Sequence, residues 1–446
     1  LLKELYKKMK ISNSDIVFAA SSADQKQKKV LHPVFGLWKT YLCDDLREEL
    51  ERGVRKVMIF NQFTRPAFLD LDNLSDVADA ILTGESKICD DQHYEKYMVN
   101  HIPELLFFVG DIRTADGIAA KSEEIHEQIM NALRAMRTIL TPPLYRQIDD
   151  YFITKNFKTK EPGAYDHDAF RNWCMNDAGL EDTNMLAAFL VCLCISELGK
   201  VRVWKDALIP HLTKSASVSN QLKNSAEDSY LIHAGIETES CHATFLPSLL
   251  SLNEDSMKYI ELTHGANFTF GQYAQLENVP ASLVDLQNVA SETKEYDGKK
   301  AMNFCLLCQV IRLAGSSFGG RIPLFIFRPF FDAIESLQPL ADGASPIEVY
   351  EKRLNSTGDA LQVEDELTRV EAKLQVIHDK ISARFQDFDE FRDGFRRAFL
   401  RLAKYGRYIK KCEGTEALLK AFLSLEPSTV LHLVEELNKN GIDNGW

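Results

Sequence analysis

Long stretches of helical periodicity constrain the fold of this chain more than any other feature. Apolar residues recur with helical spacing at residues 115–140, 185–198, 230–252, 301–314 and 363–403. Few runs in this part of the chain alternate between apolar and polar side chains as strands do. We therefore expect an all-α fold from residue 85 onward, divided into a domain at 85–340 and a long-helix part at 341–446.

The first 84 residues have a different pattern, in which short apolar runs alternate with helical segments. Residues 15–20 and 32–38 resemble short strands, whereas residues 40–52 and 74–82 carry helical stripes. Short strands that alternate with helices are typical of an α/β layer. The expected fold class is therefore an α/β segment over residues 1–84, followed by a larger all-α domain. Glycine and proline at residues 340–357 favour a mobile loop there.

Charge and cysteine content narrow the function. The net charge of −13 argues against a nucleic-acid partner, because phosphate neutralisation needs a basic surface. The nine cysteines are scattered, and the pairs Cys192/Cys194 and Cys305/Cys308 lie in apolar, helix-like runs. We therefore expect buried, reduced thiols in a cytoplasmic protein. We find no apolar run long enough to cross a bilayer, so we expect no membrane partner.

Four segments of the first part, at residues 15–21, 32–38, 44–58 and 68–77, resemble the C-terminal part of the molybdenum cofactor guanylyltransferases. Those enzymes are Rossmann-like nucleotidyltransferases that act in molybdenum cofactor biosynthesis. The resemblance implies that His32 begins a strand lining the substrate side of the sheet. It also implies that Asp70 and Asp72 stand where the family has asparagines facing a nucleotide or molybdopterin partner.

The departures from that family carry chemistry. An asparagine donates and accepts hydrogen bonds, whereas an ionised aspartate only accepts them. Asp70 and Asp72 would repel a polyphosphate unless a divalent cation lay between them. Either this edge binds metal, or nucleotide binding is lost and the two residues merely cap the helix at 74–82.

The catalytic half of that family is not found in this chain. It includes a glycine-rich phosphate loop and a magnesium-binding aspartate. We therefore expect residues 1–84 of this chain to have no nucleotidyltransferase activity. The chain does not begin with methionine, so the missing half could lie upstream. Magnesium with GTP or molybdopterin is expected only in that case.

A weaker resemblance lies in the helical part. Residues 90–446 resemble an uncharacterised helical family, and residues 193–200 resemble the helix end that carries the His-Asp pair of the HD superfamily of metal-dependent phosphohydrolases. That resemblance implies a metal site formed by His126, Glu197, His233 and His242. Ser196 and Glu197 replace the His-Asp pair, and serine is a poor ligand for divalent metals. The four residues therefore form a working metal site, form a degenerate ligand pocket, or are ordinary helix residues.

Polar residues after residue 270 give a second candidate site. Gln272, Gln275, Glu277 and Asn278 either line a pocket in the helical core or lie on the outer face of a helix that Pro280 ends.

Three functions follow from these patterns. The first is a guanylyltransferase-like fragment fused to a helical domain. The alternatives are an HD-like metal-dependent phosphohydrolase and a non-catalytic helical module that binds a ligand or a protein. The sequence does not give the oligomeric state.

Overall fold

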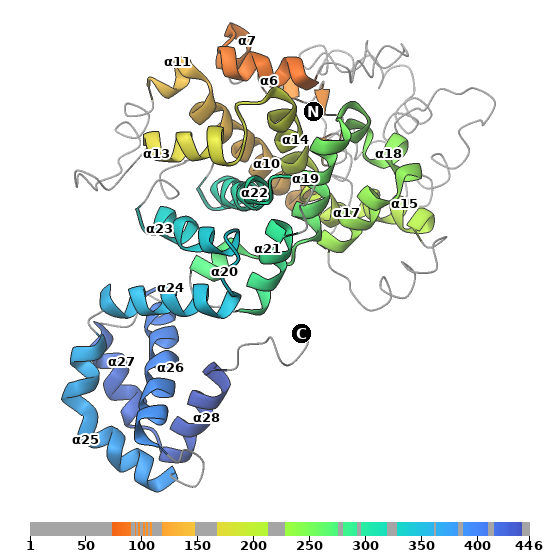
Figure 1. Cartoon of the computed structure of the whole chain (residues 1–446). Helices are drawn as coiled ribbons and strands as arrows, with labels where there is room; N and C mark the ends of the chain where they lie inside the picture. Colours follow the sequence, from red (N-terminus) through yellow and green to blue (C-terminus); the bar gives the residue numbers. More distant parts are fainter. Residues whose placement is uncertain are drawn as a thin grey trace. The chain divides into compact units, whose positions relative to one another are not determined.

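The structure is a computed structural model whose regular elements are helices (Figure 1). It describes residues 74–90, 94, 97, 98, 101, 102, 104, 105, 108, 118–147, 167–212, 228–274, 280–291, 296–318, 328–360, 363–381, 387–408 and 414–438. The chain divides into two units. Unit 1 comprises residues 1–266 and 303–328, and unit 2 comprises residues 267–302 and 329–446. The expected boundaries at 84/85 and 340/341 fall inside unit 1 and unit 2, respectively, and stay predictions.

The α/β fold class predicted for residues 1–84 is wrong, whereas the all-α expectation for the rest agrees with the structure. The described residues form helices and contain no strand. The strands predicted at 15–20 and 32–38 lie outside the described residues. Residues Leu74–Thr83 form the expected helix, α6, but its apolar face packs on helix α14 of the helical body. Short apolar runs do not separate strand from helix by periodicity, and this ambiguity caused the error.

Unit 1 is built around one helix that is apolar on all sides. Its described helices are α6 (Leu74–Thr83), α7 (Ser86–Cys89), α10 (Ile118–Leu140), α11 (Pro142–Tyr145), α13 (His167–Asn172), a π-turn η3 (Trp173–Asp177), α14 (Thr183–Ile195), η4 (Leu198–Lys200), α15 (Arg202–Leu212), α17 (Asp228–Glu237), α18 (Glu239–Phe245), η5 (Pro247–Ser251) and α19 (Glu254–Gly265). Every residue of α14 from Met185 to Ile195 is buried, and α6, α10 and α19 pack around this helix. A helix with no polar face is stable only when it is covered on all sides.

The expectation that no apolar run is long enough to cross a bilayer is wrong, because the stretch Thr183–Lys200 is one candidate membrane span among the described residues. It is long and apolar enough to cross a bilayer, but 78% of it is buried inside the protein. Such burial is what the central helix of a soluble protein shows.

A single acidic side chain begins α14. Asp182 accepts hydrogen bonds from the backbone N–H groups of Asn184 (2.9 Å) and Met185 (3.0 Å), which have no partner within the helix. We expect Asp182→Ala to lower the free energy of unfolding by about 1 kcal/mol. Chemical denaturation measures this loss, and Asp182→Asn is the control because it keeps the acceptor. Equal losses in the two variants would contradict the capping role.

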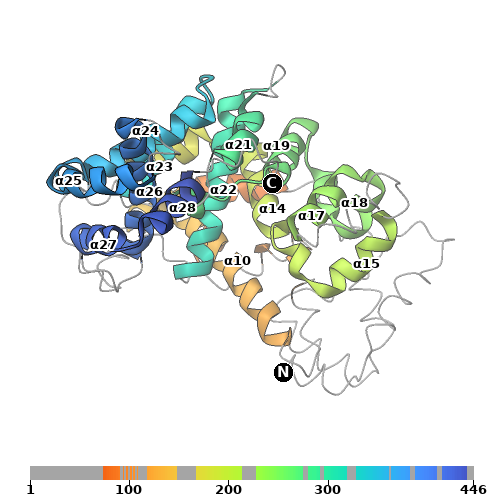
Figure 2. The ribbon, with the colours of Figure 1, turned by 90° about the horizontal axis from the view of Figure 1, so that it is seen from below.

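Helices α15, α17 and α18 pack against one another in unit 1 (Figure 2). Trp204 of α15 is fully buried there, and its indole N–H donates to the Phe245 carbonyl at the end of α18 (3.1 Å). The apolar stripe expected at residues 230–252 is divided into α17, α18 and η5. The second break falls at Pro247, which has no N–H to continue a helix.

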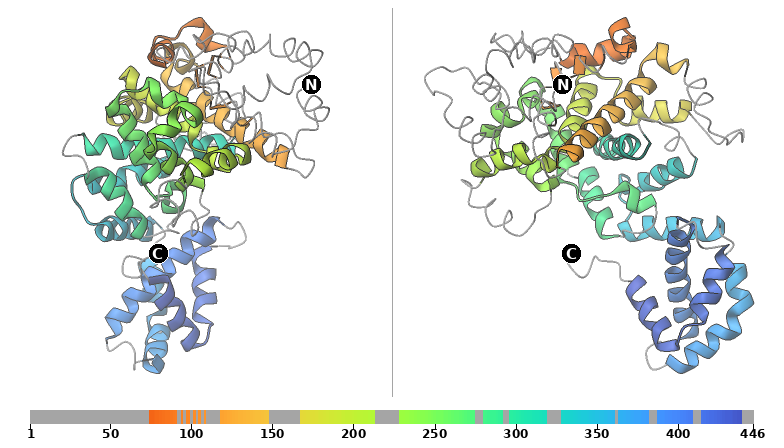
Figure 3. Two further views of the ribbon diagram at one scale, coloured as in Figure 1. Left: turned by 90° about the vertical axis from the view of Figure 1, so that its right-hand side faces the viewer. Right: turned by 180° about the vertical axis from the view of Figure 1, so that it is seen from behind.

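Unit 2 contains the C-terminal helices. Its described elements are α20 (Phe270–Ala274), α21 (Ala281–Ser291), α23 (Arg328–Leu337), η7 (Gln338–Leu340), α24 (Pro346–Ala360), α25 (Val363–Ile381), α26 (Phe388–Tyr408), α27 (Gly414–Leu423) and α28 (Pro427–Asn438). Helix α22 (Gly298–Phe318) begins in unit 2 and belongs to unit 1 from residue 303 onward. Helices α25 to α28 pack as a bundle around α26 (Figure 3). Phe391, Phe395 and Phe399 of α26 are buried.

The mobile loop expected at residues 340–357 is largely helix α24. The Ser345 hydroxyl accepts from the Glu348 N–H (3.2 Å), and the Glu348 carboxylate accepts from the Ser345 N–H (2.9 Å). This reciprocal capping box begins the helix, with Pro346 at a position where a missing N–H costs nothing.

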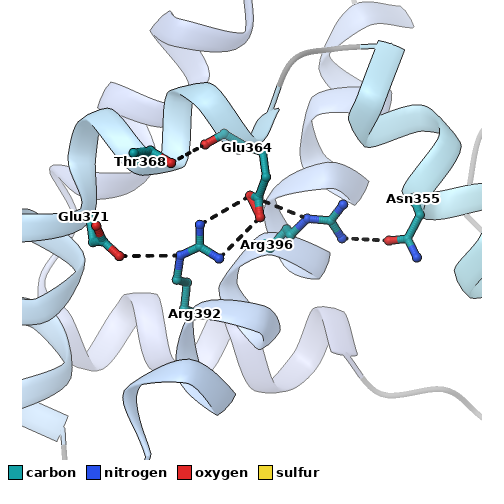
Figure 4. A network of polar contacts seen from close by, with 6 residues as sticks. All are labelled: Asn355, Glu364, Thr368, Glu371, Arg392 and Arg396. Atoms are coloured by element: carbon teal, nitrogen blue, oxygen red, sulfur yellow. Dashed lines mark hydrogen bonds and ion pairs between the residues drawn. The ribbon is translucent and has the colours of Figure 1, made fainter.

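Polar contacts join α24, α25 and α26 (Figure 4). Both guanidinium N–H₂ groups of Arg392 donate to Glu364 (3.3 and 3.4 Å), and Arg396 donates to Asn355 (2.7 Å). The Glu364 side chain is 56% exposed, so we assign this network little net stability and attribute the bundle to its buried aromatic residues.

Candidate functional site

Two cysteines and a histidine from three different helices meet inside unit 1. The Cys308 thiol of α22 donates to the Cys192 sulfur of α14 at a Sγ–Sγ distance of 3.5 Å. Nε2 of His264, in the last turn of α19, lies 3.6 Å from the same Cys192 sulfur. No disulfide joins the two cysteines. We call Cys192, Cys308 and His264 the thiol cluster.

Helix α22 contributes Cys308 to the thiol cluster, and its packing fixes the position of this residue. Cys305, Cys308 and Arg312 follow one another at spacings of three and four residues, so they lie on one helix face. Two contacts hold the N-terminal half of α22 in unit 1. Phe304 packs edge-on against Phe189 of α14, with ring centroids 5.4 Å apart, and Asn303 accepts from the Trp173 indole N–H (3.1 Å).

An ion pair lies beside the cluster. Glu197 follows the last turn of α14, and its carboxylate accepts from Nε of Arg312 (3.2 Å) and from a second nitrogen of the same guanidinium. Lys200 pairs with the other carboxylate oxygen. Burial raises the pKa of Glu197, but the charges of Arg312 and Lys200 outweigh it and lower the pKa below its ordinary value. The ion pair therefore fixes Arg312 one helical turn beyond Cys308.

The neighbouring charges give the Cys192 thiol a lower pKa than those of Cys174 and Cys305, which are also buried. Burial alone would raise its pKa, but the hydrogen bond from Cys308, the charge and hydrogen bond of His264, and the charge of Arg312 together lower that pKa below the ordinary thiol range. Burial raises the pKa of Cys174, and it raises that of Cys305 to about 12. The arrangement thus favours a thiolate at Cys192 and a protonated thiol at Cys308, whose pKa burial raises further.

The four residues predicted to bind metal occupy different elements of unit 1. His126 lies on α10, Glu197 after α14, His233 on α17 and His242 on α18. Glu197 pairs with two cations, and Nε2 of His242 lies 2.6 Å from the Ile236 carbonyl oxygen. Within the described residues no group of three or more His, Cys, Asp or Glu could hold a metal ion. The metal site stays a prediction without support from this geometry.

Most of the other predicted site residues lie outside the part of the chain that the structure describes. His32, Asp70, Asp72, Gln275, Glu277 and Asn278 lie outside the described residues. Gln272 lies on α20 in unit 2, where it is partly buried beside the fully buried Tyr273. The predicted pocket of polar residues after residue 270 therefore stays a prediction.

The thiol cluster does not follow from the sequence pattern, although both cysteine pairs are visible there. Cys192/Cys194 and Cys305/Cys308 are two separate pairs along the chain. The structure instead brings one member of each pair together across 116 residues and adds His264.

Fold and cluster together define a protein that is helical throughout its described residues and contains a buried thiol–imidazole cluster. A model of a family of unknown function, DUF6829, matches residues 149–446. The match spans well over half of the chain, so the chain belongs to this family. It covers α14, α19 and α22 but begins after α6 and α10.

No curated protein and no solved structure matches the chain. The resemblance of residues 1–84 to a molybdenum cofactor guanylyltransferase is wrong, and with it the assignment to molybdenum cofactor biosynthesis. The family that the comparison shows is DUF6829, and the described residues contain none of the strands that a Rossmann-like enzyme needs.

Proposed function

We propose that this protein is a thiol-reactive helical protein in which Cys192 acts as a nucleophilic thiolate. The observation that carries the proposal is the meeting of Cys192 with His264 at 3.6 Å and with Cys308 at 3.5 Å. A thiolate needs a cationic or hydrogen-bonding environment to form near neutral pH. His264, Arg312 and the Cys308 S–H provide that environment on one side of α14.

The same geometry favours thiol chemistry over the HD-like phosphohydrolase. A metal ligand needs a free lone pair aimed at a shared point. Glu197 spends both carboxylate oxygens on Arg312 and Lys200 instead. In contrast, the Cys192 sulfur is directed at a basic side chain and a second thiol.

The thiols also support a cytoplasmic location, which is part of the proposal. Seven cysteines among the described residues are free. Buried free thiols are the usual form of cysteine in proteins of reducing compartments.

Site-resolved alkylation tests the proposed thiolate. We expect Cys192 to react with iodoacetamide at about pH 6.5 at least about tenfold faster than Cys174, because a pKa lower by one unit gives tenfold more thiolate in that range. Cys174 is a matched internal control, since it is equally buried in unit 1 but has a raised pKa. Mass spectrometry of peptides from the native protein gives both rates.

The histidine supplies the second arm of this test. We expect His264→Gln to shift the pH profile of Cys192 alkylation upward by about one unit and to leave Cys174 unchanged. His126→Gln is the control for loss of a histidine elsewhere in unit 1. Equal rates and equal pH profiles for Cys192 and Cys174 in the wild-type protein would rule the proposal out.

A further inference from the structure

Cys308 is placed to react with Cys192 after the latter is oxidised. Its S–H donates to the Cys192 sulfur, and the two sulfur atoms are 3.5 Å apart. A disulfide needs a sulfur–sulfur distance of about 2.05 Å, so the two atoms must approach by about 1.5 Å for the bond to form.

The neighbouring cysteines are less suitable partners. Cys305 lies one turn earlier on α22, where its thiol hydrogen-bonds to Thr263 and Gln309. Cys194 is two residues from Cys192 on α14, so it points to a different side of that helix. The geometry therefore selects Cys308 among the cysteines of this region.

Burial limits what can oxidise the site. Cys192 is 1% exposed and Cys308 is 2% exposed, which leaves no room for the disulfide of a peptide or a protein to reach them. The charged neighbours lie nearer the surface, with the side chains of Lys200 and Arg312 41% and 39% exposed. The oxidant must therefore be small, and hydrogen peroxide is a small, uncharged and polar oxidant.

We propose that a small hydroperoxide oxidises Cys192 and that Cys308 then forms a disulfide with it, joining α14 to α22. This inference rests on the proposed function, since it needs a nucleophilic sulfur at Cys192. It adds the class of oxidant and the resolving cysteine, and it makes the cluster a sensor of peroxide.

The chemistry takes place in two balanced steps. In the first, the Cys192 thiolate attacks one peroxide oxygen, a sulfur–oxygen bond forms and the oxygen–oxygen bond breaks. The leaving oxygen takes a proton from His264 and departs as water from hydrogen peroxide, or as an alcohol from an alkyl hydroperoxide, and the positive charge of Arg312 stabilises the negative charge that develops on it. Cys192 is then a sulfenic acid.

In the second step, the Cys308 sulfur attacks the Cys192 sulfur. A sulfur–sulfur bond forms, the sulfur–oxygen bond breaks, and the hydroxyl leaves with the Cys308 proton as water. Two thiols lose two electrons in total, and the hydroperoxide gains them.

Peroxide treatment of the full chain, followed by non-reducing peptide mapping, tests the inference. We expect a Cys192–Cys308 cross-linked peptide as the dominant product, lighter by two hydrogen atoms than its reduced components. In Cys308→Ala we expect Cys192 to be trapped by dimedone as the sulfenic acid instead. Cys305→Ala is the matched control on the same helix, and it should form the Cys192–Cys308 cross-link as the wild type does.

The outcomes separate this inference from the proposed function. Fast alkylation of Cys192 without any peroxide product there would overturn the inference and leave the reactive thiolate standing. A dominant cross-link from Cys192 to Cys305 or Cys194 would overturn the role of Cys308. Slow alkylation of Cys192, equal to that of Cys174, would sink both. If Cys308→Ala does not fold, as judged by circular dichroism, the maps of the wild type and of Cys305→Ala decide alone.

Discussion

Gly315→Ala is expected to lower the free energy of unfolding by about 3 kcal/mol or more, which is at the severe end for a single added methyl group. A Cβ atom at this position of α22 would lie 2.2 Å from the backbone oxygen of Gln128 on α10. It would also lie 2.9 Å from both the nitrogen and the Cβ of Ala132. The oxygen and the nitrogen are backbone atoms and the Cβ is attached directly to the backbone, so none of the three can rotate away as the end of a side chain can. The two helices must move apart instead.

Gly235→Ala is the matched control for this substitution. Gly235 also lies in a unit 1 helix, but the three atoms nearest to its added Cβ would all belong to leucine side chains, the nearest being Cδ1 of Leu246 at 3.4 Å. We expect Gly235→Ala to be neutral or to stabilise by up to about 1 kcal/mol, because alanine favours a helix more than glycine does. Chemical denaturation followed by tryptophan fluorescence measures both, since Trp173 and Trp204 belong to unit 1. Similar effects of the two substitutions would show that α22 and α10 are not in close contact.

Raising the pH from 5 to 8 is expected to destabilise unit 1 by up to about 3 kcal/mol through one buried carboxyl group. Glu104 is fully buried, and burial raises its pKa from 4.5 to about 7, although hydrogen bonds from Ser248 oppose the shift. The Ser248 N–H (2.8 Å) and hydroxyl (2.5 Å) both donate to this carboxylate. Because the pKa is higher in the folded state, the folded protein holds a proton that the unfolded chain has already lost. The stabilisation is complete below pH 4.5 and is lost as the pH rises through about 7.

Glu104→Gln separates this group from the rest of the chain. Its amide mimics the protonated acid, because it accepts from the Ser248 N–H and carries no charge. The variant should be more stable than the wild type at about pH 8, and the difference should vanish near pH 5. The measurement is the free energy of unfolding of both proteins across this pH range. Parallel pH profiles would contradict a protonated Glu104 in the folded state.

Much of the helical architecture could be predicted from the sequence, because it depends on local patterns. The apolar periodicity of residues 74–82 predicted α6, and the glycine after it, Gly84, adopts the left-handed conformation (φ +77°) that ends the helix. Helix α24 could also have been predicted from the sequence, but the expectation there was a mobile loop. Its signal is the Ser345–Glu348 capping box, which was outweighed by the glycine and proline residues around it.

The fold class of the first 84 residues and the thiol cluster could not be predicted from a single sequence. Short apolar runs fit a strand or a buried helix equally well, and a family resemblance over a few such runs led to the wrong fold class. The thiol cluster depends on how α14, α19 and α22 pack, which is a property of tertiary structure. The spacing of Cys192 and Cys308 along the chain carries no information on their 3.5 Å contact.

The interleaving of the two units bears on how the chain matures as it leaves the ribosome. Residues 1–266 of unit 1 are synthesised first, but Phe304, Cys308 and Gly315, which pack on α14 and α10, emerge only after residues 267–302 of unit 2. Until then, the nascent chain carries an apolar surface on α14 where Phe304 will pack, and Cys192 has no thiol partner on α22. Unit 1 therefore completes its core late in translation, and no single cut yields it as one contiguous fragment.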